Sequence, residues 1–165
     1  ENFGAATVRA ALDQNPRLRL VRFASSGGII AEGMDIAAAE GALDITIDYV
    51  QERQAFGQAI GQFQNTRFKL ADVRTEIALN RALYEQCADE YSRGELTADK
   101  AAMLKLASCE MQCSTIDDCL QLFGGYGYTK DFPVEKFYRD SKLCTIGEGT
   151  SEIQKLVISR EILKG

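Results

Sequence analysis

The sequence contains no histidine, and only two of its 165 residues, Pro16 and Pro133, are proline. Without histidine the chain cannot form a Ser-His-Asp triad or a Cys-His pair, and it has few routes to a zinc site. The same absence excludes a di-iron carboxylate centre built on Glu-x-x-His pairs. We therefore expect no metal site. The scarcity of proline favours long, uninterrupted helices.

The chain also has little basic charge and no long apolar run. Its net charge is -5 and no block of lysine and arginine stands out, which argues against a nucleic-acid partner. No apolar run approaches the roughly 20 residues of a membrane span, and the first residues lack the order of a signal peptide. Because the chain begins at Glu1 rather than methionine, we expect a fragment or a processed product.

Cysteine is present in an odd number and with helical spacing. The five residues are Cys87, Cys109, Cys113, Cys119 and Cys144. This usage favours reduced thiols, and we expect a cytoplasmic protein, or one of the mitochondrial matrix in a eukaryote. Cys109 and Cys113 could hold a metal from one helix face, but both fall in an apolar stripe and are interpreted as small hydrophobes.

Apolar residues recur with helical periodicity over most of the chain. The pattern predicts long helices over about residues 29–54, 62–92 and 97–123, and shorter ones over about 131–144 and 151–163. Nothing alternates with period two for long, so no sheet is expected. Helices joined by short loops predict an all-α fold, an up-and-down four-helix bundle. Residues 1–27 are interpreted as a lead-in segment and residues 28–165 as the bundle domain.

One carboxylate, Glu148, lies between Gly147 and Gly149. The two glycines remove side-chain bulk and permit unusual backbone angles, so the carboxylate can project into a confined space. Its apolar flank favours a raised pKa, which suits a general base. The same residues are also typical of an ordinary helix start, with Thr150 as the cap and Glu152 near the positive end of the helix dipole. The residues alone leave both interpretations open.

Several separated motifs occur in order along the chain. They are Arg53-Gln54-Ala55-Phe56-Gly57, Phe63-Gln64, Gln121-Leu122-Phe123-Gly124-Gly125-Tyr126-Gly127-Tyr128, Pro133-Val134-Glu135-Lys136, Tyr138-Arg139-Asp140 and Glu148-Gly149-Thr150-Ser151-Glu152-Ile153-Gln154. Together they resemble the carboxy-terminal helical domain of the acyl-CoA dehydrogenase family, over about residues 29–164. A complete subunit of that family has an amino-terminal helical domain and a middle β-domain before this bundle. The resemblance thus implies that the chain is the carboxy-terminal part of a larger dehydrogenase.

The resemblance implies an FAD cofactor that lies between the middle and helical domains and also contacts a neighbouring subunit. Arg53 would contact the diphosphate, because a guanidinium offers paired donors in a fixed geometry. Phe56 would pack near the cofactor, Gln64 would hydrogen-bond on the adenosine side, and Thr150 and Glu152 would meet the cofactor of their own subunit. A second contact, through closely approaching backbone N–H groups, would come from Gln121, Leu122, Phe123, Gly124 and Gly125. Each residue also has an ordinary structural interpretation, as a solvated charge, a core aromatic or a helix end.

Glu148 matches the family's catalytic base. The resemblance implies that it removes the α-proton of an acyl-CoA thioester while the β-hydrogen leaves as hydride to the flavin N5, which yields a trans-2-enoyl-CoA. Gly149 would lie against the thioester, and an electron-transfer flavoprotein would accept the electrons. The family assembles as tetramers, so self-association is implied. We expect the chain alone to be inactive and to bind FAD weakly or not at all, because half of the site is missing.

Two positions depart from the family pattern. Gly147 stands where medium-chain members often carry a bulky aromatic residue, and Gly28 stands where an arginine associated with substrate is common. A few members place the base near residues 27–28, where this chain has no carboxylate, which favours Glu148. Two other functions stay open: a non-catalytic helical module for assembly and cofactor support, and an acyl-CoA oxidase-like relative that uses oxygen.

Overall fold

The computed structural model describes residues 28–164, and the expected lead-in segment, residues 1–27, lies outside them. Five α-helices make up most of the described part, and their bounds lie within a few residues of those predicted. They are α2 (Gly28–Glu52), α3 (Gln64–Ser92), α4 (Ala98–Phe123), α5 (Val134–Cys144) and α6 (Ser151–Ile162). The predicted all-α fold is confirmed.

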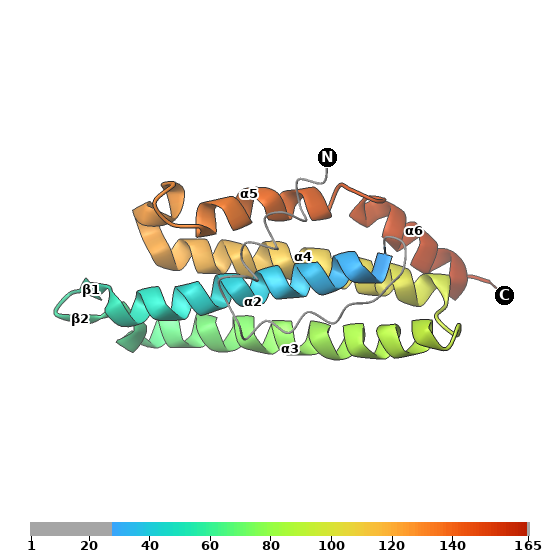
Figure 1. Cartoon of the computed structure of the whole chain (residues 1–165), viewed down its shortest axis with the longest axis horizontal. Coiled ribbons are helices and arrows are strands. Elements are labelled where there is room, and N and C mark those ends of the chain that lie inside the picture. The colour runs from blue at the N-terminus through green and yellow to red at the C-terminus, as the bar shows by residue number, and fades with distance from the viewer. Residues whose placement is uncertain (1–27, 165) are drawn as a thin grey trace.

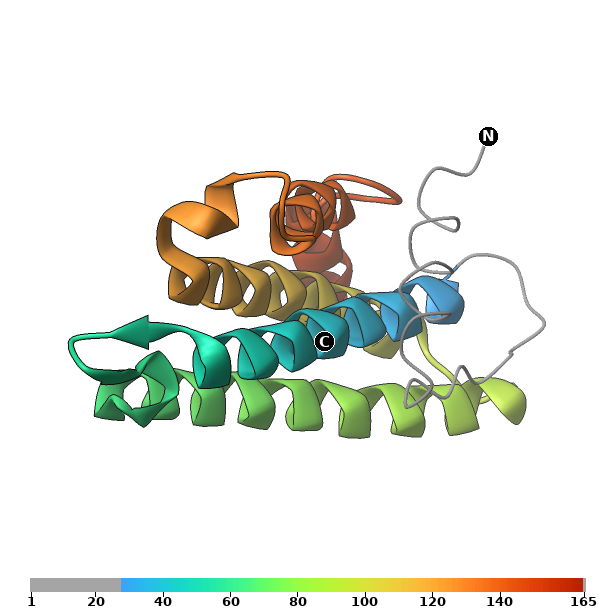
Figure 2. The same cartoon turned by 60° about the vertical axis from the view of Figure 1, so that its left-hand side comes forward.

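The helices run up and down along one axis, with α4 at the centre (Figure 1). Helix α3 runs back alongside α2, and α4 then runs back alongside α3. Helix α5 reverses direction once more and lies over α4. Helix α4 packs against each of the other four helices. Figure 2 shows that α5 and α6 cover the side of α4 that faces away from α3. Helix α4 therefore connects the two ends of the bundle as one continuous helix.

The prediction missed one short hairpin between α2 and α3. Strands β1 (Gln54–Ala55) and β2 (Gln58–Ala59) pair antiparallel, with Ala55 opposite Gln58, and the 3₁₀ helix η1 (Ile60–Gln62) follows. The turn has positive φ at Phe56 (52°) and Gly57 (81°), as two-residue hairpin turns require. Strands of two residues are too short to show period-two alternation.

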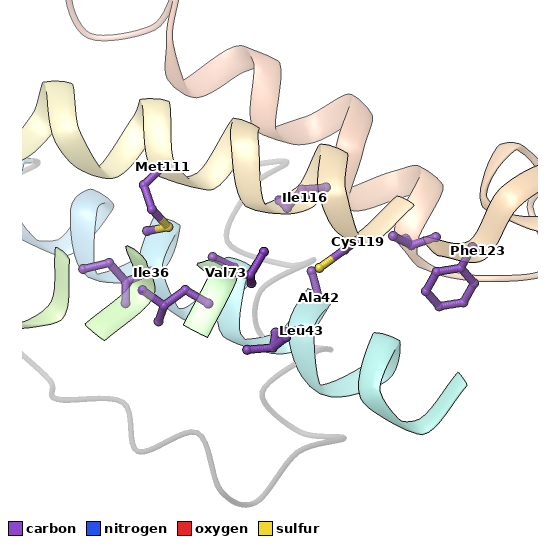
Figure 3. Packing of buried hydrophobic residues seen from close by; sticks show 11 residues of the cluster. Ile36, Ala42, Leu43, Val73, Met111, Ile116, Cys119 and Phe123 are labelled. Carbon is purple, nitrogen blue, oxygen red and sulfur yellow. The ribbon is translucent and has the colours of Figure 1, made fainter. Parts of the chain in front are cut away.

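The core lies where α2, α3 and α4 meet. Leu43 is 1% exposed at the middle of α2, and Ile116 is fully buried on α4. The rings of Tyr49 and Phe123 stack with their centroids 4.1 Å apart and close one end of the core. Figure 3 shows the side chains that interdigitate between the three helices: Ile36, Ala42, Leu43, Val73, Met111, Ile116, Cys119 and Phe123.

All five cysteines are free thiols. Cys119 packs in the core, and Cys113 donates a hydrogen bond of 3.4 Å to the backbone carbonyl of Ser141. Within residues 28–164 no group of three or more histidine, cysteine or acidic side chains is arranged to hold a metal ion. Nor does this part of the chain contain a helix both long enough and apolar enough to cross a membrane.

Candidate active site

The loop between α5 and α6 presents Glu148 in an uncommon backbone conformation. Its φ is 54°, and that of the following Gly149 is 96°. A positive φ is rare for a residue with a side chain. The Glu148 side chain is exposed. Thr150 is the N-cap of α6, because its hydroxyl accepts a hydrogen bond of 3.4 Å from the Ile153 amide. The expected cap is confirmed, and Glu148 lies just outside the helix.

A lysine from the bundle ties this loop down. The Lys105 ammonium, on α4, donates hydrogen bonds to the carbonyl oxygens of Gly149 (2.6 Å) and Cys144 (3.2 Å). The Gly149 oxygen also accepts from Gln154 Nε2 at 3.2 Å. Before Glu148, the Gly147 amide donates to the end of α5 at 2.8 Å. The backbone is thus anchored on both sides of the carboxylate.

Replacing Lys105 with methionine is expected to loosen the loop. The change keeps the apolar stem but removes both hydrogen bonds from a charged donor, each worth about 1.5–3 kcal/mol. Amide hydrogen exchange over residues 145–149 should accelerate by about tenfold or more. Lys100→Met is the matched control, because Lys100 pairs with Glu90 instead. Equal acceleration in both variants would show that Lys105 does not hold the loop.

Two buried carboxylates of α2, Glu32 and Asp35, belong to the same region, and sequence reasoning missed both. Their exposed fractions are 5% and 7%. Asp35 accepts hydrogen bonds from the thiols of Cys144 (3.1 Å) and Cys109 (3.4 Å). Desolvation by burial raises the pKa of both carboxyls, that of Glu32 to about 7, and the charge of Glu148 adds to the increase. Burial is therefore the main cause of the raised pKa of both carboxyls.

The raised pKa of Glu32 has a defined effect on stability. Below pH 4.5, the usual pKa of this group, its carboxyl is protonated in the folded and the unfolded chain alike. As the pH rises toward about 7, the unfolded chain ionises first. The stability that the protonated group contributes is therefore lost as the pH rises through the folded-state pKa.

Most of the predicted cofactor residues lie at the other end of the bundle. The Arg53 guanidinium carbon is 5.4 Å from the ring centroid of Tyr126, so η2 (Gly124–Tyr128) lies beside the start of the hairpin. Phe56 is 97% exposed at the turn, and Gln64 is exposed at the first position of α3. The Arg53 guanidinium and the exposed ring of Tyr126 therefore lie side by side. Such an arrangement is suited to a nucleotide ligand.

The segment at the end of α4 divides into exposed and buried residues. Gln121 is exposed and Leu122 is half-buried. At Gly124 and Gly125, an added Cβ would have no heavy atom within 4 Å, so their surface is open to a ligand. Phe123 differs, because its ring belongs to the core and stacks on Tyr49. That ring is not part of the exposed surface.

The β1–β2 hairpin and the loop between α5 and α6 lie well apart along the bundle (Figure 1), so the predicted site residues form two separate groups. One group is Glu148, Gly149, Thr150 and Glu152, and the other is Arg53, Phe56, Gln64 and residues 121–125. Lys105, which anchors the first group, is sixteen residues from Gln121 on α4, or about 24 Å at 1.5 Å per residue. The two groups are too far apart to hold the same atoms of one cofactor.

An open groove of about 850 Å³ lies beside the first group, between α4, α5 and α6. Thr150 and Glu152 line it, together with two lysines, of which Lys155 pairs with Glu110 at 3.3 Å. Backbone hydrogen bonding at the start of α6 and the Thr150 hydroxyl lower the pKa of the Glu152 carboxyl. The groove therefore offers polar groups of both signs next to the Glu148 loop.

Comparison with known proteins identifies the family of the chain. Residues 27–163 match the family described as acyl-CoA dehydrogenase, C-terminal domain. The chain therefore belongs to the acyl-CoA dehydrogenase family and corresponds to its C-terminal domain. It is 44% identical, over 83% of its length and 34% of the relative's, to acryloyl-CoA reductase (NADH) of Anaerotignum propionicum.

Two solved structures share the fold with a TM-score of 0.80. One is butyryl-CoA dehydrogenase of Megasphaera elsdenii, which is 32% identical over 82% of this chain and 36% of that one. The other belongs to a structure of the electron transferring flavoprotein of Acidaminococcus fermentans, with 36% identity over 83% of this chain and 36% of that one. The chain spans about a third of the length of the proteins it matches.

Proposed function

We propose that this chain is the part of an FAD-dependent acyl-CoA dehydrogenase that carries the catalytic base, Glu148. The observation that supports the proposal best is the loop itself. An exposed carboxylate lies on a backbone with positive φ, and hydrogen bonds from Lys105 and Gln154 anchor the next carbonyl. A general base needs such a defined position, because proton transfer requires the base within hydrogen-bond reach of its substrate.

In the proposed reaction, Glu148 removes the α-proton of an acyl-CoA thioester. When bound, the flavin of FAD supplies the acceptor for the β-hydrogen, which leaves as hydride. Glu148 ends the step protonated, and the product is a trans-2-enoyl-CoA. Gly149, the next residue, would lie against the thioester. The Lys105 hydrogen bonds hold the loop while the proton moves.

The two groups of polar residues are proposed to hold different FAD molecules. Thr150 and Glu152 would meet the cofactor of their own subunit beside the groove. Arg53, Phe56, Gln64 and residues 121–125 would hold the diphosphate and adenosine of the cofactor in a neighbouring subunit. The separation of about 24 Å along α4, at 1.5 Å per residue, supports this division. Self-association is therefore part of the proposal.

The opposite direction is a second candidate, which the reductase relative favours. By microscopic reversibility, protonated Glu148 would give its proton to the α-carbon of a 2-enoyl-CoA while reduced flavin supplies the hydride. The same side chains serve both directions. An electron-transfer flavoprotein is the proposed redox partner, and the structural match to a chain in a structure of an electron transferring flavoprotein supports it.

Anaerobic titration of the complete flavoprotein with a panel of thioesters tests the proposal. Saturated acyl-CoAs should bleach the absorbance of the oxidised flavin. When 2-enoyl-CoAs are added to the reduced protein, they should reoxidise the flavin and restore that absorbance. Free CoA and the free acids are the controls and should do neither. If no thioester changes the flavin spectrum, the non-catalytic support module is the better description. If oxygen restores the bleached flavin as fast as a flavoprotein acceptor does, the oxidase-like alternative is favoured.

A further inference from the structure

Asp35 is a buried carboxylate of α2, and the reaction proposed above assigns it no role. Its exposed fraction is 7%, and both of its oxygens accept hydrogen bonds from thiols. Cys144 donates to Oδ1 at 3.1 Å, and Cys109 donates to Oδ2 at 3.4 Å. Thiols are weak donors, and a buried carboxylate gives up its hydration. The two hydrogen bonds replace that hydration poorly, so stability does not explain an aspartate at this position.

Three helices meet at the Asp35 carboxylate. Asp35 belongs to α2, Cys109 to α4, and Cys144 is the last residue of α5. Asp35 and Cys144 are 109 residues apart in the sequence. Helix ends fray unless contacts hold them. The bond from Asp35 therefore fixes the end of α5 to the long helices of the bundle.

Cys144 is also the residue from which the Glu148 loop departs. Its thiol is held by Asp35, and its carbonyl oxygen accepts a hydrogen bond of 3.2 Å from the Lys105 ammonium. The same ammonium donates to the carbonyl of Gly149, the residue after Glu148, at 2.6 Å. Helices α2 and α4 thus fix the start of the loop, and α4 also fixes the backbone just beyond the carboxylate. A shift of Cys144 would move Glu148 with it.

We propose that Asp35 is a positioning residue of the reaction, which acts through the Cys144 thiol and fixes the end of α5 from which the Glu148 loop departs. This inference rests on the proposed function, because it takes Glu148 as the base. Asp35 contacts neither the thioester nor the flavin in this scheme. Its effect is on the placement of the base, and a misplacement of about 1 Å can cost roughly 10²-fold in rate.

The first test compares Cys144→Ala with Cys144→Ser in the complete flavoprotein. Alanine removes the donor to Asp35, whereas the hydroxyl of serine can still donate. Cys144→Ala should lower the limiting rate of flavin reduction by about threefold to 30-fold, part of what a misplacement of about 1 Å can cost. The thioester concentration at half-saturation should stay within about twofold, because the binding groups are unchanged. Cys144→Ser should bring the limiting rate back to within about threefold of the native value.

Cys87→Ala is the matched control for the loss of a thiol. Cys87 is fully buried on α3, a helix that holds neither Asp35 nor the Glu148 loop. Its replacement should leave the limiting rate within about twofold. Two results would overturn the inference. In one, Cys144→Ala reduces its flavin at the native rate. In the other, Cys144→Ser is as slow as Cys144→Ala, which is the result expected if the sulfur only fills space.

The second test changes the other partner of the hydrogen bond. Asp35→Leu removes the acceptor of both thiols, and an apolar residue in place of a buried charge is often neutral or stabilising. The midpoint of thermal unfolding should therefore stay or rise, while the limiting rate falls about as far as in Cys144→Ala. The double variant should be no slower than either single one, because both act through the same bond. A lower midpoint together with the lower rate, or losses of rate that multiply, would assign Asp35 a structural role instead.

A third measurement needs no turnover. Infrared spectroscopy resolves the S–H stretching bands of cysteine thiols, and the band lost in Cys144→Ala is that of Cys144. A hydrogen bond to a carboxylate lowers the S–H stretching frequency, so Asp35→Leu should move the Cys144 band to higher frequency. The band of Cys113, whose thiol donates to the Ser141 carbonyl, is the internal reference and should not move.

An unmoved Cys144 band would refute the contact on which the inference depends. If Asp35→Leu fails to fold, the comparison of Cys144→Ala with Cys144→Ser still decides the matter. Absence of bleaching in the native protein would instead refute the proposed function, and the S–H band would still show whether Asp35 holds the end of α5.

Discussion

Glu148→Gln is expected to slow flavin reduction by the best thioester by about 10²–10⁴-fold, the usual contribution of a general base. Glutamine keeps the size and hydrogen-bonding capacity of the side chain but cannot accept the α-proton. Because Glu148 is exposed and lies outside α6, the fold should be unaffected. Stopped-flow absorbance under anaerobic conditions measures the rate, and spectral perturbation by the thioester measures binding.

Glu161→Gln is the control for this variant. Glu161 is an exposed carboxylate on α6 that pairs with Lys164, so its replacement should leave the rate within about twofold, as for a surface change of under 0.5 kcal/mol. If Glu148→Gln reduced its flavin at the native rate, the base would have to be another group. Weakened thioester binding with an unchanged rate at saturation would assign Glu148 to substrate positioning instead.

Leu43→Ala is expected to lower the free energy of unfolding by about 2–5 kcal/mol. Leu43 is 1% exposed and lies in the cluster that joins α2, α3 and α4. Its truncation loses the burial of three carbon atoms and leaves a cavity that tightly packed helices cannot fill completely. Urea unfolding followed by circular dichroism measures the loss.

Leu79→Ala provides the matched comparison on the surface of α3. Leu79 is 60% exposed, so the same chemical change should cost at most about 0.5 kcal/mol. A similar loss in both variants would mean that the core does not lie between the three long helices. A loss confined to Leu43→Ala would support the packing shown in Figure 3.

The helices could be predicted because their signals are local. Ile29, Ile36, Leu43 and Val50 recur every seven residues on α2, and all four are buried. Gly94 and the Gly124-Gly125 pair follow the ends of α3 and α4, where glycine is favoured. The β1–β2 hairpin was missed because its strands are only two residues long. Periodicity needs a longer stretch than that to be visible.

The site could be predicted only in part. Glu148 and Thr150 belong to a compact motif, so a single segment of sequence locates them. Glu32 was missed although it follows Ile29 by three residues and precedes Ile36 by four, which places it on the buried stripe of α2. This spacing could have identified Glu32 as a buried residue of α2. The surroundings of Glu32, in contrast, depend on how α2 packs against α3 and α4, and no local pattern encodes that packing.

The backbone conformation at Glu148 lowers the stability of the domain, while the side chain at this position serves the proposed function. A left-handed conformation costs a residue with a side chain about 1 kcal/mol or more, and glycine adopts it freely. Glu148, with its φ of 54°, therefore occupies a position where glycine would make the domain more stable. Selection for thermal stability alone would tend to replace the carboxylate. A glutamate at this position fits selection for chemistry, with the rest of the bundle supplying the stability that this residue gives up.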